Sequence, residues 1–394
     1  MRIEPIDPTV IELARLLENN SIGVTYLTPR PGGGSLTGEV AQEVERALAT
    51  LEGSACMPDG LVYGNGCFAI ARYTDAAEVY RRILTCSPDD PAARFNLGVA
   101  YVRLQMFREA ADEFTTLLEQ EPFLAEAYYQ RGNAYDDLGK PDAALEDYAR
   151  AIKLNPDYLQ ALYNQGIVLS RLGRHLEALD AFDQVITLRP DLSNAYLNRG
   201  ASLDEMGRHE EAIADYTAAI RYNPSGYNAY FNRARTCYYL GYIQEAISDY
   251  SQVVALTPDD AEAYNNRGLA FDALGDYQMA IEDYSQAIAL RPHFAEAYNN
   301  RGAAFEALEN EEEALREYLA AVAIAGDYAD AHYNAARLYA RSDDLDRCIQ
   351  HLEKATELEP ELQTDAVQND DLGWVLELHK MRENRQDWLH GRQG

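Results

Sequence analysis

The chain repeats itself with a period of 34 residues. Frames that begin at residues 57, 91, 125, 159, 193, 227, 261, 295 and 329 follow one another to residue 362 without an insertion or deletion. A fixed period of this length is typical of a solenoid, in which each unit packs only on its neighbours. The period therefore predicts an apolar core that extends along a line instead of gathering in one globule.

The pattern within each unit predicts a pair of helices. With each frame numbered from 1 to 34, position 8 is always glycine or alanine, position 20 is alanine in eight frames, and position 24 is aromatic in eight frames. At 100° per residue, positions 4, 8 and 11 form one apolar stripe, and positions 20, 24 and 27 form another. Small residues at positions 8 and 20 allow close packing of the two helices. Glycine at position 15 of five frames allows a tight turn between them, and proline at position 32 ends the second helix.

This pattern resembles the tetratricopeptide repeat family, and the resemblance covers about three quarters of the chain. It implies an all-α fold, namely a right-handed superhelical solenoid of antiparallel helix pairs. It also implies that the first helices line a concave groove, which in this family commonly holds a partner polypeptide. The first frame is a weaker match, because it has Gly60 at position 4 and Cys67 at position 11.

The repeats divide the chain into three predicted parts. Residues 1–56 are expected to form an N-terminal helical extension or cap with a Pro/Gly-rich loop, residues 57–362 the nine repeats, and residues 363–394 a C-terminal capping helix with a basic tail. Caps are expected because the terminal repeats would otherwise expose an apolar face. One hypothesis is that the β-branched, extended stretch of residues 20–36 folds back into the groove and competes with the partner.

Composition limits the partners and the chemistry. A net charge of −31 argues against nucleic acid, whose binding is driven by Lys and Arg that neutralise phosphates. Five widely spaced cysteines without a C-x-x-C motif indicate neither a disulfide framework nor a metal site, and no cofactor motif is seen. No segment approaches the ~18 consecutive apolar residues of a membrane-spanning helix, and no signal peptide is recognised. The expected compartment is the cytoplasm.

Positions 7 and 23 vary together. Five frames have Arg at position 7 and an acid at position 23, whereas Gln165 and Ala335 occur with the non-acidic Ala181 and His351. The two positions lie at equal height on an antiparallel hairpin, so we predict a salt bridge within each repeat. If the pair is partly exposed, it contributes about 0 to 1 kcal/mol. The predicted pairs are Arg131/Asp147, Arg199/Asp215, Arg233/Asp249, Arg267/Asp283 and Arg301/Glu317, and Leu97 with Glu113 is the exception.

Position 6 carries the strongest indication of function. It lies roughly opposite the buried stripe of its helix, where Asn is less favourable than Ala, Glu or Lys by several tenths of a kcal/mol. An amide offers both a donor and an acceptor, as the main chain of an extended peptide requires. The predicted peptide-binding ladder is Asn96, Gln130, Asn164, Asn198, Asn232, Asn266, Asn300 and Asn334.

The resemblance adds to this interpretation, because the ladder is similar to the asparagine ladder that lines the groove of O-linked N-acetylglucosamine transferases. The alternative is that the amides bond to neighbouring repeats. Lys at positions 5 or 13, which co-chaperones of the family use to hold a carboxylate, is missing here.

Positions 5, 9, 12 and 13 are expected to set the groove's preference. They predict that the groove is acidic in its middle, has an aromatic and cationic site in frame 227, and is basic at its C-terminal end, the basic mouth, in frame 329. The alternative is that these charges only keep an exposed face solvated. The acidic and amide residues are Asn133, Asp136, Asp137, Asp204, Glu205, Asp272 and Glu306. The aromatic and basic ones are Phe231, Arg235, Tyr238, Tyr239, Tyr333, Arg337 and Arg341.

The sequence thus favours a non-enzymatic adaptor or scaffold that binds an extended polypeptide in its groove. No phosphate-binding, metalloprotease or nucleophile-elbow motif is present. Two alternatives remain. One is a structural scaffold that assembles as a homo-oligomer, and the other is a targeting module for a separate enzyme chain.

Overall fold

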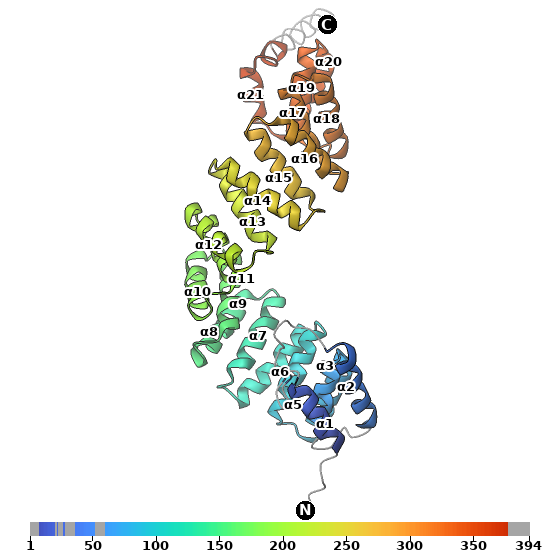
Figure 1. The fold of residues 1–394 in the computed structure, drawn as a ribbon, viewed down its shortest axis with the longest axis vertical. Coiled ribbons are helices and arrows are strands. Elements are labelled where there is room, and N and C mark those ends of the chain that lie inside the picture. The colour runs from blue at the N-terminus through green and yellow to red at the C-terminus, as the bar shows by residue number, and fades with distance from the viewer. Residues whose placement is uncertain (1–7, 20–21, 23–26, 28–35, 52–59, 377–394) are drawn as a thin grey trace, which may run out of the picture. The chain divides into compact units, whose positions relative to one another are not determined.

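The computed structural model describes residues 8–19, 22, 27, 36–51 and 60–376, and in these ranges it contains helices and turns but no strand. The chain divides into two compact units, Met1–Asn198 and Arg199–Gly394. Within each unit, helices that follow one another in the chain pack side by side (Figure 1). The all-α fold of stacked antiparallel helix pairs is confirmed.

The first unit contains two N-terminal helices and then the helix pairs of the first repeats. Its helices are α1 (Pro8–Asn19), α2 (Gly38–Leu51), α3 (Gly60–Ala69), α4 (Tyr73–Cys86), α5 (Pro91–Arg103), α6 (Phe107–Gln120), α7 (Ala125–Asp137), α8 (Pro141–Leu154), α9 (Leu159–Arg171) and α10 (His175–Leu188). The boundary between the units falls within α11 (Ser193–Glu205).

The second unit continues the helix pairs and ends in a short extra helix. Its helices are α12 (His209–Tyr222), α13 (Tyr227–Tyr239), α14 (Ile243–Leu256), α15 (Ala261–Ala273), α16 (Tyr277–Leu290), α17 (Ala295–Ala307), α18 (Glu311–Ile324), α19 (Ala329–Arg341), α20 (Leu345–Leu358) and α21 (Leu362–Gln368). From α5 to α20, every first helix covers positions 1–13 of its frame and every second helix covers positions 17–30.

The turn between the two helices needs a residue with positive φ at position 15. Five frames place glycine there, for example Gly139 with φ of 69°. Four other frames hold a non-glycine residue in the same left-handed conformation, for example Glu309 with φ of 59°. The turn geometry is therefore kept even where the residue type is unfavourable, because the helices on both sides impose it.

The small residue at position 8 is required by the aromatic ring at position 24. A Cβ added to Gly166 would lie 2.7 Å from Cε1 of Phe182, and one added to Gly268 would lie 2.7 Å from Cε1 of Tyr284. Both rings are fully buried. The two helices of a repeat are thus in contact through a ring that packs directly on the glycine backbone.

All five predicted salt bridges within the repeats are present. The closest N–O distances are 2.6–2.7 Å. The four aspartates are only 4–6% exposed, so these pairs are more buried than the sequence suggested. In several repeats the same guanidinium also donates to a hydroxyl at position 25 of the preceding repeat, as Arg233 does to Thr217 at 2.8 Å. Each such arginine therefore ties two neighbouring repeats together.

The exceptions to the salt-bridge pattern have substitutes on the same helix. Glu113, which faces Leu97 in the pattern, pairs with Arg94 at position 4 instead, at 2.8 Å. In the last repeat, His351 at position 23 likewise meets His332 at position 4, with the two Nδ1 atoms 2.9 Å apart. In these two repeats, position 4 supplies the partner that position 7 does not.

The histidine pair is expected to make the last repeat sensitive to acid. Burial lowers the pKa of both His332 and His351. The charge of Lys354 lowers the pKa of His332 further, and the charge of His332 lowers that of His351. Because both folded pKa values lie below the unfolded value of about 6.5, the stabilisation is complete above that pH and falls as the pH drops towards the folded values. Urea unfolding at pH 7.5 and 5.5 should show a larger loss for the natural chain than for H332N/H351N. Equal losses in the two proteins would contradict this expectation.

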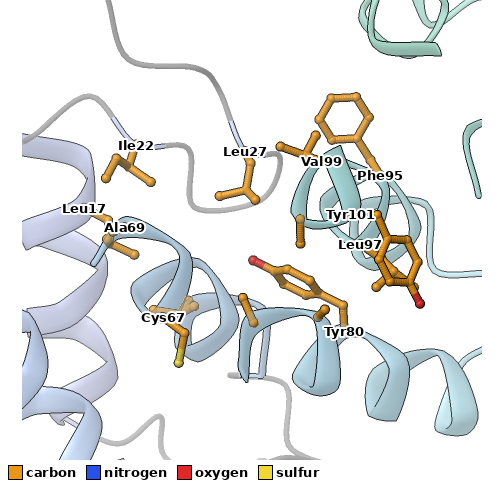
Figure 2. Packing of buried hydrophobic residues seen from close by; sticks show 14 of the residues in the cluster. Leu17, Ile22, Leu27, Cys67, Ala69, Tyr80, Phe95, Leu97, Val99 and Tyr101 are labelled. Carbon is orange, nitrogen blue, oxygen red and sulfur yellow. The ribbon is translucent and has the colours of Figure 1, made fainter. Parts of the chain in front are cut away.

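The N-terminal cap packs on the first repeat. α1 and α2 both contact α3, and Leu13, Leu17, Val44 and Leu48 are buried between them. Figure 2 shows the adjoining part of this cluster, where Ile22 lies near Leu17. Residues 1–56 thus contain two helices, α1 and α2, that pack on the first repeat.

The C-terminal end contains a short helix, α21, that was not predicted as a separate element. In the segment after it, Leu372 and Val375 are buried, whereas Trp374 is 42% exposed. The predicted basic tail, residues 379–394, lies outside the described residues. Within the described part of the chain, no helix is long and apolar enough to cross a membrane.

Candidate binding surface on the first helices

The first helices of consecutive repeats touch one another and form a continuous surface within each unit. α5 contacts α3 and α7 in the first unit, and α15 contacts α13 and α17 in the second. Hydrogen bonds from one first helix to the next join side chains at positions 5, 6, 9, 10, 12 and 13. We call the surface formed by these positions the first-helix face.

At Asn96, the first member of the amide ladder, a main chain is bound. The N–H of Leu27 donates to Oδ1 of Asn96 at 2.8 Å. The Asn96 Nδ2 donates to Oδ1 of Asn65, at position 9 of the preceding repeat, at 2.9 Å, and the hydroxyl of Tyr80 also donates to that oxygen at 2.7 Å. The amide thus uses its donor within the scaffold and its acceptor on a backbone that comes from outside the repeats.

The same arrangement recurs two repeats later. Nδ2 of Asn164 donates to Oδ1 of Asn133 at 2.9 Å, and the hydroxyl of Tyr148 donates to the same oxygen at 2.9 Å. Asn164 is half-buried, and no donor to its Oδ1 occurs among the described residues. The Asn133–Tyr148–Asn164 set therefore presents an acceptor equivalent to the one that binds Leu27.

The other ladder residues fall into three groups. Nδ2 of Asn198 donates to the Tyr163 hydroxyl at 2.8 Å, and Asn300 and Asn334 donate to Asn265 and Asn299, both at 3.1 Å. Gln130 bonds instead to Glu126 of its own helix at 2.9 Å. The side chains of Asn232 and Asn266 form no hydrogen bond within the described residues. The alternative interpretation, bonding between repeats, thus holds for the Nδ2 donor of five ladder residues, namely Asn96, Asn164, Asn198, Asn300 and Asn334.

Leu27 lies at the edge of a cavity on the first-helix face. The cavity has a volume of about 200 Å³ and is lined by Leu27, Phe68, Val99, Tyr129 and Gln130, among others. Leu27 is 2% exposed, and Figure 2 shows it beside Val99. The hypothesis that residues 20–36 fold back is supported at Leu27; residues 20, 21, 23–26 and 28–35 lie outside the described part of the chain.

The two arginines of the predicted basic mouth are not free. Arg337 pairs with Glu306, and Arg341 pairs with Glu306 at 3.0 Å and with Asp371 at 2.8 Å. The prediction of a basic mouth at these residues is wrong, because acids of the preceding repeat and of the C-terminal segment neutralise them. These partners lie 30 to 35 residues away in sequence, so only the packing of the repeats reveals them.

The aromatic and cationic residues of frame 227 are more accessible. Arg235 is exposed and forms no ion pair with a described residue. Tyr239 is 74% exposed and lies against the ring of His209, with 4.8 Å between the ring centroids. Burial and the charge of Asp272 raise the pKa of the neighbouring Tyr238.

Several amide partners were not among the predicted site residues. Asn65 was overlooked because the first frame departs from the repeat pattern. Asn265 and Asn299 are both at position 5, and the recurrence of Asn there in two consecutive frames was the available signal.

Three solved structures that this chain resembles are as follows. YrrB, described as a TPR protein with an unusual peptide-binding site, is 22% identical over 48% of this chain and 96% of its own, with a TM-score of 0.44. PilW, a type IV pilus biogenesis factor, is 25% identical over 52% and 96%, with a TM-score of 0.46. The APC/C hetero-tetramer Cut9–Hcn1 is 16% identical over 85% and 80%, with a TM-score of 0.45. Comparison with curated proteins finds no match.

Family models identify the repeats directly. Models described as tetratricopeptide repeat match residues 71–132, 129–193, 193–225, 261–294 and 329–362, and one described as TPR repeat matches residues 234–275. Together these matches span more than half of the chain and agree with the helix pairs described above. The chain therefore belongs to the tetratricopeptide repeat family.

Proposed function

We propose that the first-helix face binds an extended polypeptide of a partner protein, whose main-chain N–H groups donate to the amide oxygens of the ladder. Repeats of this family typically serve protein–protein interaction. The observation that carries the proposal is the contact between the Leu27 N–H and Oδ1 of Asn96, at 2.8 Å. It is the contact that the proposal requires, made by the chain's own segment.

The hydrogen bonds that the amides form between repeats determine which amide atom is left for the ligand. At Asn164, Asn198, Asn300 and Asn334 the Nδ2 group is used between repeats, which holds each amide in one orientation. A fixed amide loses less conformational entropy on binding than a free one. The ladder therefore offers a set of oriented acceptors, and the ligand must supply donors, which every residue of an extended main chain except proline carries.

Methylation of a peptide's main chain tests this recognition mode. A 15-residue peptide selected on the immobilised full chain from a random library would be N-methylated at one residue at a time. Because successive residues of an extended chain face opposite sides, we expect losses of tenfold or more in affinity at alternating residues and small changes between them. A loss that follows only the side-chain identities, with no effect of N-methylation, would remove the proposal.

A matched pair of variants tests the same idea from the protein side. N164A/N232A/N266A removes three ladder amides, two of which make no hydrogen bond that folding depends on. Q184A/Q252A/Q286A removes three exposed amides from the second helices. We expect the first variant to bind the selected peptide at least tenfold more weakly and the second within twofold of the natural chain, both with unchanged circular dichroism. Equal affinities of the two variants would contradict the proposal.

A further inference from the structure

Acids at position 12 of the first-helix face meet side chains of the next repeat. Asp136 pairs with Arg171, at position 13 of the following frame. Glu306 pairs in the same way with Arg341 at 3.0 Å, and it also accepts from Arg337 at position 9. In two places, therefore, a carboxylate at position 12 pairs with a guanidinium of the following repeat.

Asp204 has a different but complete set of partners. Its carboxylate accepts from His209 at 2.9 Å, from the hydroxyl of Tyr216 at 2.9 Å and from Thr236 at 2.5 Å. Of the four acids at position 12, three are therefore satisfied by side chains of this chain.

Asp272 is the fourth acid, and its side-chain carboxylate has no hydrogen-bond or ion-pair partner among the described residues. The following repeat has Ala303 at position 9 and Ala307 at position 13. At these positions the repeats that follow Asp136 and Glu306 supply Arg171, Arg337 and Arg341. Both alanines are exposed, so the space that a guanidinium occupies beside Glu306 is open beside Asp272. The hydroxyl of Tyr284 does not donate to Asp272, whereas Tyr318 donates to Glu306 at 2.8 Å from the equivalent position.

The surroundings of Asp272 favour a cation. Burial alone raises the pKa of Asp272, which means that its carboxylate is partly desolvated without compensation. Its charge also raises the pKa of Tyr238 in the preceding repeat, so that ring lies within electrostatic range. A carboxylate next to an aromatic ring attracts a cation by charge and by the ring's quadrupole.

We propose that Asp272, with the open surface over Ala303 and Ala307, is a subsite for an arginine or lysine side chain of the polypeptide bound along the first-helix face. This inference rests on the proposed function, since the cation belongs to the bound chain. The net charge of −31 acts in the same sense, because it favours the approach of a basic segment.

The subsite can be tested without knowing the partner. The full chain, labelled with ¹³C at its alanine methyl groups, would be titrated with the tripeptide acetyl-Gly-Arg-Gly-amide and with its neutral citrulline analogue. We expect saturable shifts of the Ala303 and Ala307 methyl signals with the arginine tripeptide and none with the citrulline analogue. D272N should weaken binding at least tenfold. D276N removes the same charge from an exposed residue four positions away and should change the affinity less than twofold.

A substitution that closes the subsite gives an independent readout. A307R places an arginine where Arg341 stands relative to Glu306, so we expect it to pair with Asp272, to raise the melting temperature and to abolish the tripeptide shift of the remaining Ala303 methyl signal. Shifts that persist in D272N, or that weaken equally in D276N, would overturn the proposal. They would show that the tripeptide is attracted by the overall negative charge of the protein and not by Asp272. The tripeptide test does not depend on the ladder amides, so a negative result here would leave the N-methylation experiment to decide the proposed function by itself.

Discussion

Replacing Arg267 with leucine is expected to destabilise the second unit by about 3 to 5 kcal/mol, because it leaves the carboxylate of Asp283 buried without its partner. Arg267 holds that carboxylate through two hydrogen bonds of 2.6 and 2.7 Å, and Asp283 is only 4% exposed. The hydrogen bond to Asp283 raises the pKa of Arg267, so the guanidinium is charged at any neutral pH. The loss should appear as a lower melting temperature and as faster amide exchange in α15 and α16.

Two controls separate the buried charge from the loss of an arginine. R267L/D283L removes both charges and should recover most of the stability, since a buried pair can often be replaced by apolar residues without loss. R208L breaks the pair between Arg208 and Glu211, whose side chains are 40% and 57% exposed, and should change stability by less than ~1 kcal/mol. An R267L variant as stable as R208L would show that the buried pairs do not hold the repeats together.

Replacing Phe182 with alanine is expected to destabilise the first unit by about 3 to 5 kcal/mol, as for other buried aromatic rings. The ring is fully buried and fills the space over Gly166, which has no side chain to move into the cavity. Thermal unfolding of the full chain should show an earlier transition, and exchange should accelerate first in α9 and α10, because neighbouring repeats are coupled only through their shared interfaces.

An exposed phenylalanine of the same unit is the control for this prediction. Phe123 is 81% exposed, so F123A should change stability by no more than ~0.5 kcal/mol. F182L keeps part of the buried volume and should fall between the two. Equal stability of F182A and F123A would mean that the ring over Gly166 is not what closes the repeat.

The pairs formed within one repeat were predictable, because both partners belong to the same unit and vary together along the chain. Arg267 with Asp283 was derived in this way. For Gly166 and Phe182 the sequence predicted only a small and an aromatic residue on the two packed stripes, not their contact. Helix bounds followed for the same reason, since the period places every turn. The depth of the salt bridges was not predictable, because burial depends on the repeats above and below.

The ladder was predicted as a row of position-6 amides. It was not predicted that the Nδ2 group of an amide bonds to the neighbouring repeat while its oxygen serves as an acceptor for a main chain. The bonds of Asn164 to Asn133 and of Asn300 to Asn265 run between repeats that the sequence analysis treated separately. The contact of Leu27 with Asn96 spans 69 residues and begins in a segment outside the repeat pattern. Likewise, the pairing of Arg341 with Asp371 removed the expected basic mouth.

By itself, the sequence determined the helix pairs, their family and the bonds inside each hairpin. These interactions are local, and the same residue pattern for them recurs in every repeat. Only the tertiary structure decided which polar groups on the first-helix face remain available. That outcome depends on which side chain of the next repeat or of the terminal segments reaches each amide and carboxylate. Within the described part of the chain, no side chain of a neighbouring repeat donates to Oδ1 of Asn164 or to the carboxylate of Asp272.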